Sequence, residues 1–431
     1  MVPGTWGGGG EPTGGASSSV GGGTGTWRGG ELLQFASLLK AGGRNTPGKI
    51  LQTPVVAPPP APLPHASSSA AAAGPPHGRT VSGSGGTALP PLPPAARAGG
   101  GTSGKVPEHR LAKFQRLLDA RVIDLDALRE LCWNGVPPSL RPDCWRLLSG
   151  YCPPNKARQA TILRRKRLEY QEMVPTYYEI ADSERSDEEL TALRQVRVDV
   201  PRTAPTVPFF HEPRIQQSLE HLLYIWGIRH PASGYVQGMN DLMTPFLAVF
   251  LGEHLPGPIE TWQLEALTEE MLLQVEADCY WCLCKLVETI QDHYTYAQPG
   301  VQRTVFLCAE VCRSACPTLS ARMAEENVDF IQFAWRWANC LLIREVPFEL
   351  SFRLWDTYLA EGSRFADFLV YACAGFLLLW RTTLEPMEFQ DMIMFLQKPP
   401  TQEWKEPDLE MVLGQAFILR DTYPEAHLQS L

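Results

Sequence analysis

From about residue 106 onward, apolar residues recur at steps of three and four, which is the spacing of one face of an α-helix. The stretches with this spacing are His109–Leu131, Ile215–Trp226, Leu264–Ile290, Val328–Leu342 and Phe365–Arg381. Prolines fall mainly between these stretches, where they end helices because proline has no amide hydrogen to donate. Strand-like alternation is scarce and no repeat of fixed period is visible, so the pattern predicts an all-α domain.

The first 105 residues are rich in Gly, Pro, Ser and Ala. Such a segment cannot bury enough apolar surface to offset its chain entropy, so we expect a disordered, low-complexity N-terminal tail over residues 1–105. Two interpretations of the tail stay open. It is an inert linker, or it binds an adaptor through an apolar helical face at residues 31–40 or a proline run at residues 90–94.

Residues 106–431 are expected to form the folded domain. At about 320 residues it is large enough for two packed helical lobes. We place the N-terminal lobe at about residues 106–245 and the C-terminal lobe at about residues 246–425.

Charge narrows the classes of partner. Residues 1–105 carry seven basic and two acidic residues, and residues 106–431 carry 31 basic and 45 acidic residues. The folded part is therefore acidic, which argues against nucleic acid, because phosphate binding needs a positive surface. The longest apolar run, residues 368–380, is shorter than the roughly 20 residues of a membrane span. We interpret it as a buried core helix and expect only indirect membrane contact.

Eleven cysteines are scattered along the chain, with one group at residues 279–284 and another at residues 308–316. Zinc is one interpretation, but neither group has a Cys/His pair at zinc-finger spacing. The second group recurs every four residues, as thiols on one buried helix face would. The first thirty residues contain no apolar segment of a secretory signal, and together these features predict a cytoplasmic protein with core thiols.

The segment Val196–Thr203 places Arg202 directly after a proline and three residues after Asp199. Pro201 ends any preceding helix and fixes the local φ, so we expect Arg202 on a stiff loop, with Asp199 limiting its rotamers. A guanidinium held in this way can neutralise charge that grows on phosphoryl oxygens during hydrolysis of a phosphoanhydride. The alternative is an ordinary surface ion pair, worth under about 1 kcal/mol.

The segment Tyr235–Asp241 places Gln237 before a glycine, 35 residues after the arginine. A glutamine amide can hold an attacking water in line with a phosphoryl group. Gly238 would let the backbone of this chain approach a partner closely beside Gln237, and the Asn240 side chain would fix the turn through bonds to the backbone. The alternative is that Tyr235 and Gln237 only cap a helix that follows.

Three motifs in this order resemble those of the TBC domain of Rab GTPase-activating proteins. Gly135-Val-Pro, Leu-Arg-Pro and Trp-Arg-Leu-Leu-Ser-Gly150 look like its first signature. Val196-x-x-Asp-x-x-Arg202 is similar to the family's arginine-finger motif, with Val in place of Ile, and Tyr235-Val-Gln237 is similar to its glutamine-finger motif. The resemblance spans roughly residues 108–425. Segments 228–237 and 291–300 look most like the branch typified by TBC domain family member 22.

The resemblance implies a two-lobed helical TBC domain that activates GTP hydrolysis by a Rab-type small GTPase in its GTP form. The hydrolysis would occur in the bound GTPase, with two side chains supplied in trans. Arg202 carries over as the arginine finger and Gln237 as the glutamine finger. The expected supporting residues are Asp199, Tyr235, Gly238, Asn240 and Asp241. Arg141 and Trp145 are expected to be scaffold, with Arg141 tying helix ends together and Trp145 filling apolar space.

The sequence contains no Gly-x-x-x-x-Gly-Lys-Ser/Thr loop, so we do not expect the chain itself to bind GTP. We expect no cofactor of its own, and action on Mg-GTP held by the partner. The resembling branch suggests peripheral association with endomembranes such as the Golgi. The rival interpretation is a catalytically silent scaffold or adaptor that grips a Rab protein.

Overall fold

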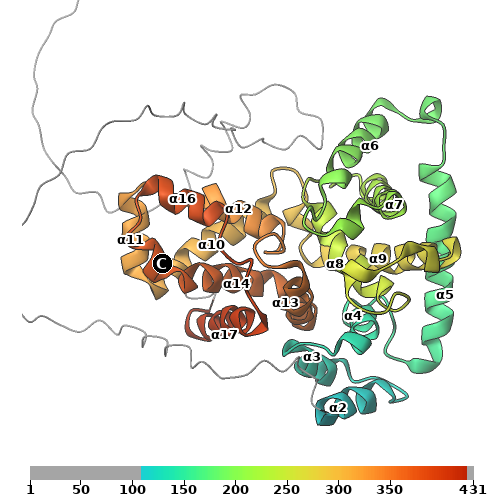
Figure 1. Ribbon diagram of the computed structural model, residues 1–431, viewed down its shortest axis with the longest axis horizontal. Helices are drawn as coiled ribbons and strands as arrows, with labels where there is room; N and C mark the ends of the chain where they lie inside the picture. Colours follow the sequence, from blue (N-terminus) through green and yellow to red (C-terminus); the bar gives the residue numbers. More distant parts are fainter. Residues whose placement is uncertain (1–107, 425–431) are drawn as a thin grey trace, which may run out of the picture. The chain divides into compact units, whose positions relative to one another are not determined.

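The computed structural model describes residues 108–424, and all of them lie in one compact unit. Across this range the chain forms helices and turns, with a single isolated β-bridge between Val122 and Asn155. The predicted all-α class is therefore confirmed, and the predicted tail over residues 1–105 lies outside the described residues. The α-helices of this range are α2 (Glu108–Leu118), α3 (Leu125–Trp133), α4 (Arg141–Leu148), α5 (Lys156–Met173), α6 (Asp187–Asp199), α7 (Pro213–Arg229), α8 (Met239–Leu251), α9 (Glu269–Thr289), α10 (Pro299–Ala315), α11 (Pro317–Glu325), α12 (Ile331–Asn339), α13 (Phe348–Glu361), α14 (Phe365–Leu379), α15 (Arg381–Leu384), α16 (Phe389–Gln397) and α17 (Glu406–Thr422). Figure 1 labels all of them except α15.

Each stretch of helical periodicity contains at least one helix. The stretch from residue 109 to residue 131 breaks into α2 and α3, because Asp124 caps the start of α3 by accepting hydrogen bonds from the amides of Asp126 and Ala127. Several prolines begin helices instead of ending them, and they stand in the first turns of α7, α10 and α11. Proline suits that position because the amide it lacks would have no helical partner there.

Helix α9 packs against α5, α7 and α8, and a buried carboxylate joins it to earlier elements. Asp278 on α9 accepts hydrogen bonds from Arg146 Nε at 2.8 Å, Arg167 Nη2 at 2.6 Å and the Tyr151 hydroxyl at 2.7 Å. Burial alone would raise the pKa of Asp278, but the hydrogen bond from Arg167 and the charge of Arg146 hold that pKa below its ordinary value. The carboxylate therefore stays charged and ties α4 and α5 to α9.

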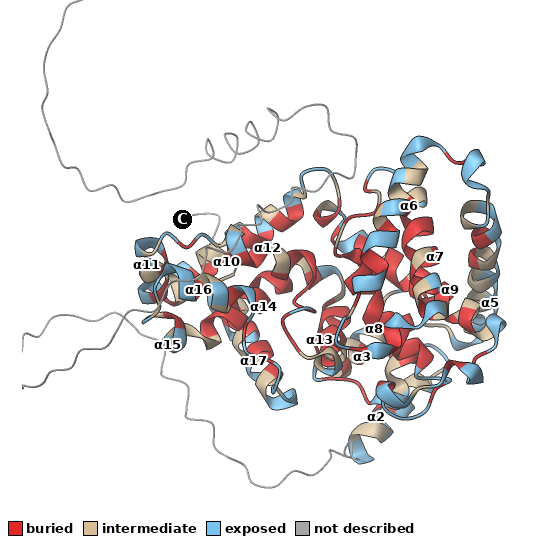
Figure 2. Ribbon diagram, turned by 45° about the horizontal axis from the view of Figure 1, so that its top comes forward, coloured by how far each residue is buried: buried red, intermediate tan, exposed pale blue. Residues whose placement is uncertain are grey.

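Helix α14 packs against α10, α12, α13 and α17. Residues Phe348–Leu379 as a whole are long and apolar enough to cross a membrane by length and composition. They form α13 and α14 with Gly362 at a φ of +58° between them, and α14 is buried along most of its length (Figure 2). The apolar run is thus a core helix, as its length predicted.

A second buried aspartate connects the beginning of the domain to α13. Asp356 accepts hydrogen bonds from the Arg141 guanidinium, from the Val136 amide at 2.8 Å and from the Trp145 indole at 2.7 Å. Arg141 therefore ties separate elements together, as expected. Trp145 is fully buried but is more than apolar bulk, since its indole N–H satisfies one lone pair of a buried carboxylate. The lobe boundary near residue 245 stays a prediction.

Candidate functional site

Helix α6 leads into the segment that carries Arg202. Its start is fixed by a capping box in which Ser186 and Glu189 each bond the other's backbone amide. Its last residue is Asp199, and a single 3-10 turn, Val200–Arg202, follows directly. The Thr203 hydroxyl donates to the Asp199 carbonyl at 3.0 Å and closes the end of the helix. We call residues 199–203 the arginine turn.

Arg202 rests on a buried carboxylate. Its Nε donates to Asp199 Oδ1 at 2.9 Å, and its Nη2 bonds the same oxygen. The Arg202 side chain is 53% exposed, whereas the Asp199 side chain is only 3% exposed. A carboxylate this deeply buried does not fit the alternative of an ordinary surface ion pair. The pairing holds the guanidinium at the surface in a restricted orientation.

Gln237 belongs to a second turn, residues 235–238, which we call the glutamine turn. Gly238 has a φ of +104° and stands at the N-cap of α8. The N-cap residue of α8 is therefore Gly238 and neither Tyr235 nor Gln237, and the Tyr235 hydroxyl bonds Asp199 instead of a helix amide, which argues against the alternative that the two residues only cap the helix. The predicted role of Asn240 is confirmed, because its Oδ1 accepts from the Gly238 amide at 3.2 Å.

Two hydrogen bonds bring the turns together. The Tyr235 hydroxyl donates to Asp199 Oδ2 at 2.6 Å, and Asn240 Nδ2 donates to the Thr203 hydroxyl oxygen at 3.0 Å. Tyr235 is 3% exposed, and burial together with the negative charge of Asp199 raises its pKa well above the ordinary value. The phenol therefore remains a proton donor at neutral pH. The two segments that the sequence separates by 35 residues form one site.

Asp241 fastens the first turn of α8 to the segment after α12. Arg344 reaches its Oδ2 through Nε at 2.7 Å and through Nη2 at 2.6 Å. Burial raises the pKa of Asp241, although the Arg344 charge opposes that shift. Pro245 deprives the Asp241 carbonyl of its helical partner, and the Thr244 hydroxyl replaces that partner at 2.8 Å.

The space beside Gly238 is filled by this chain itself. A Cβ at Gly238 would lie 2.6 Å from Asn339 Nδ2, and that nitrogen donates to the Gln237 carbonyl oxygen at 3.0 Å. Asn339 of α12 therefore occupies the space beside Gly238, and the close approach of this backbone to a partner stays a prediction. Sequence reasoning missed Asn339 because no local pattern marks it.

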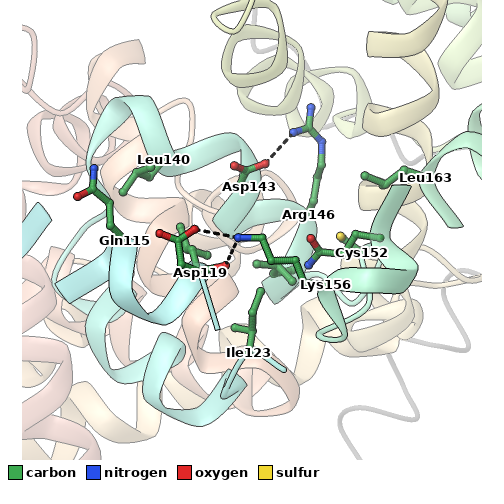
Figure 3. Close-up of a pocket in the computed structure, with 12 residues that line it drawn as sticks. Gln115, Asp119, Ile123, Leu140, Asp143, Arg146, Cys152, Lys156 and Leu163 are labelled. Carbon is green, nitrogen blue, oxygen red and sulfur yellow. Dashed lines mark hydrogen bonds and ion pairs between the residues drawn. The ribbon is translucent and has the colours of Figure 1, made fainter. Parts of the chain in front are cut away.

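The site differs from a small-molecule pocket. A cleft of about 210 Å³ lies among α2, α4 and α5, where Lys156 points toward Asp119 and Arg146 toward Asp143 (Figure 3). A second cleft, of about 430 Å³, is lined by α2 and α3. Neither cleft includes a residue of the arginine turn or the glutamine turn. The exposed guanidinium of Arg202 and the half-buried side-chain amide of Gln237 are hydrogen-bond donors that can reach groups presented by another molecule.

Within residues 108–424, no group of three or more His, Cys, Asp or Glu side chains is arranged to hold a metal ion. All eleven cysteines are buried free thiols. Cys308 and Cys312 lie on the buried face of α10, which agrees with their interpretation as core thiols. Burial raises the pKa of Cys284 and of Cys340 to about 12, so these thiols stay protonated at neutral pH.

Residues 138–384 match the family model of the Rab-GTPase-TBC domain. The chain belongs to this family. The match covers more than half of the sequence and includes both turns of the site. It confirms the resemblance that the three motifs indicated.

Two curated TBC-domain relatives match over the same part of the chain. TBC1 domain family member 22B from Homo sapiens is 43% identical over 318 residues, which are 74% of this chain and 62% of that protein. The GTPase-activating protein gyp1 from Schizosaccharomyces pombe is 44% identical over 320 residues, again 74% of this chain and 62% of that protein. The matched region thus spans about three fifths of the length of these relatives.

The TBC fold is also seen in a solved structure. The crystal structure of the Ypt/Rab-GAP domain of Gyp1p superposes with a TM-score of 0.68 at 42% sequence identity. The match covers 73% of this chain and 98% of that chain. The helical architecture is therefore that of a TBC domain.

Proposed function

We propose that this chain is a GTPase-activating protein for a Rab-type small GTPase in its GTP form. The main observation behind this proposal is that the half-exposed guanidinium of Arg202 pairs with buried Asp199. Asp199 also accepts a hydrogen bond from Tyr235, in the turn that contains Gln237. Membership of the TBC family and the names of the two relatives support the same proposal. Hydrolysis takes place in the partner's active site.

Arg202 supplies charge stabilisation. The γ-phosphoryl group passes through a loose transition state in which negative charge spreads over its oxygens, and a donated arginine is worth about 10³–10⁵ in rate. Asp199 engages Nε and Nη2 of Arg202, so Nη1 has no hydrogen-bond partner among the described residues. That exposed donor is available to a phosphoryl oxygen without a large search of rotamers.

Gln237 positions the water. Its backbone is anchored through the carbonyl, while its side-chain amide has no hydrogen bond to another residue in the range 108–424. An amide group both donates and accepts, so it can orient a water in line with the γ-phosphoryl group. In this role Gln237 substitutes for the glutamine that other GTPase systems supply from the GTPase.

The proposal includes three further statements. The chain holds no nucleotide or metal of its own and acts on Mg-GTP in the partner. Adaptors bind, if at all, through the N-terminal tail. The protein works in the cytoplasm at endomembranes, which it reaches through its partner.

A binding experiment separates catalysis from scaffolding. The full chain is titrated with a panel of Rab proteins loaded with GDP, with a non-hydrolysable GTP analogue, or with GDP and aluminium fluoride. A catalyst binds the transition-state mimic more tightly than the ground state. We expect at least a tenfold gain in affinity with aluminium fluoride for one or more Rab proteins, and loss of that gain in Arg202→Ala. Equal affinity for the analogue and the mimic would indicate a scaffold.

A further inference from the structure

A chain of side-chain amides reaches the glutamine turn from a distant part of the fold. Asn339, the last residue of α12, donates from Nδ2 to the Gln237 carbonyl oxygen at 3.0 Å. Gln298 donates from Nε2 to Asn339 Oδ1 at 2.8 Å. Asn339, which is 8% exposed, thus links Gln298 to Gln237 through hydrogen bonds. Both ends of the Asn339 amide are therefore used, which fixes its orientation.

Asn339 is held by its backbone as well. The hydroxyl of Tyr294, a fully buried residue, donates to the Asn339 carbonyl at 2.9 Å. Gln298 is in turn tied to the His293 carbonyl at 2.8 Å. Gln298 has a φ of +47° and Ala297 has a φ of +62°, so two consecutive residues other than glycine adopt the left-handed region. Strained conformations of this kind persist where the surroundings over-determine them, and they cluster at functional sites.

The position of Asn339 requires a glycine at residue 238. Any other residue at that position would bring its Cβ to 2.6 Å from Asn339 Nδ2 and would also have to adopt a φ of +104°. The amide of Gly238 is bonded by Asn240 on the opposite side. The peptide that joins Gln237 to Gly238 is thus held at its carbonyl by Asn339 and at its amide by Asn240. The Gln237 side chain has no hydrogen bond to a residue in the described range.

We propose that Asn339, oriented by Gln298, is the positioning residue for Gln237. It sets the direction in which the glutamine side chain leaves the backbone, and it does so before any partner binds. This inference rests on the proposed function in that Gln237 serves as the water-positioning group. Because misplacing a catalytic group by about 1 Å can cost on the order of 100-fold in rate, a fixed backbone at this point matters to catalysis.

The first test needs no partner. Asn339→Asp keeps the size of the side chain but lacks the N–H that bonds Gln237, and Asn327→Asp makes the same change at an exposed residue with a φ of +58°. Amide hydrogen exchange is followed in the full chain. We expect the hydrogen-bonded amides of Gly238 and Met239 to exchange at least tenfold faster in Asn339→Asp and to be unchanged in Asn327→Asp. Unchanged exchange in Asn339→Asp would overturn the inference.

A second variant covers the case in which the buried acid at position 339 prevents folding. Gln298→Met retains a side chain of similar length but removes the donor to Asn339 Oδ1. The bond from Asn339 to Gln237 then loses its support, and we expect the same amides to exchange about threefold to tenfold faster. Exchange rates equal to those of the unaltered protein would contradict the inference that Gln298 orients Asn339.

The third test uses a Rab protein that the unaltered chain activates. Asn339→Asp should lower kcat by about 10- to 100-fold with KM within about twofold, and it should add nothing to Gln237→Ala in the double variant. A merely structural role would lower the rate of both backgrounds equally. If Gln237→Ala itself stimulates normally, the proposed function fails, while the exchange experiment still decides whether Asn339 positions the turn.

Discussion

Arg202 and Gln237 lie on two neighbouring turns, and the turns hold them at different points. In the arginine turn the side chain is anchored, because Asp199 bonds Nε and Nη2 of Arg202. In the glutamine turn the backbone is anchored, because Asn339 bonds the Gln237 carbonyl and leaves the side-chain amide unbonded. The difference suits the roles that we propose for the two residues.

A guanidinium that stabilises charge needs its orientation limited in advance, since every rotamer that is lost on binding costs free energy. An amide that orients a water must adjust to the position of that water in the partner. Anchoring the backbone of Gln237 fixes the position of its Cα and leaves its side-chain torsions free to adjust. The Arg202 side chain is anchored by a residue three positions earlier, whereas the Gln237 carbonyl is anchored by a residue 102 positions away.

Removing the anchored side chain should have the largest effect. We predict that Arg202→Ala lowers the stimulated rate of GTP hydrolysis by on the order of 10³-fold or more, because the transition-state charge loses its stabilising partner. The measurement is single-turnover hydrolysis with a responsive Rab protein. Arg197→Ala is the matched control, since Arg197 is 49% exposed on α6, just before the arginine turn, and pairs with Glu220. Near-normal stimulation by Arg202→Ala would refute the arginine finger.

Removing the unbonded amide should have the next largest effect. We predict that Gln237→Ala lowers the stimulated rate by about 100-fold, with the affinity for the Rab–GTP analogue complex within a few-fold of normal. Binding is measured by titration and rate by single turnover. Gln216→Ala on α7 controls for loss of a half-buried glutamine. If Gln237→Ala abolished binding, Gln237 would be a structural residue.

The backbone anchor of the glutamine turn can be tested through stability. Gly238→Ala must accept a φ of +104° and a contact of 2.6 Å with Asn339, whereas Gly234→Ala must accept only a φ of +65°, with nothing within 4 Å of the added Cβ. Left-handed strain costs roughly 1–2 kcal/mol and overpacking costs about 1–3 kcal/mol more. We predict that Gly238→Ala is less stable than Gly234→Ala by about 2 kcal/mol in urea denaturation. Equal stabilities would show that Asn339 yields freely.

Acid should weaken the support of the glutamine turn. Burial lowers the pKa of His293 to about 4, below the ordinary value of 6.5, and the nearby charges of Asp292 and Arg303 act in opposite directions. The unfolded chain therefore binds a proton that the folded chain does not, and stability falls as the pH drops from about 6.5 toward 4. At pH 5.5 the loss relative to pH 7 should be on the order of 1 kcal/mol for this group.

Paired variants isolate that contribution. His293→Gln should lose this part of the pH dependence, while His254→Gln, at an exposed position, should keep it. Urea denaturation at pH 5.5 and at pH 7 gives, for each variant, the change in the free energy of unfolding between the two pH values. An equal change in His293→Gln and His254→Gln would mean that His293 is protonated in the folded chain as readily as in the unfolded chain.

The helices and the local half of the site could be predicted from sequence because they depend on neighbours in the chain. Periodicity marks α7, α9 and α14, and a spacing of three residues places Asp199 within reach of Arg202. The bond from Asn240 to the Gly238 amide is equally local. Patterns of this range are visible in one sequence.

The remaining contacts join residues far apart in the chain, and no local pattern records them. Asn339 stands in a segment without a motif, and the resemblance of segment 291–300 assigned no role to Gln298, yet both residues support the glutamine turn. Trp145 looks like apolar bulk until its indole is seen bonding Asp356, 211 residues away. Burial and tertiary hydrogen bonds decide these roles, and both emerge only when the helices have packed.

The most direct measurement is single-turnover GTP hydrolysis by a panel of Rab proteins, each tested in its natural form and with its own water-positioning glutamine replaced by alanine. The full chain is added unaltered, as Arg202→Ala, or as Gln237→Ala. We predict that the unaltered chain accelerates one or more Rab proteins in both forms, because Gln237 supplies the amide, and that either substitution removes the acceleration. The contrary result would be acceleration that survives Gln237→Ala but disappears when the Rab protein loses its own glutamine.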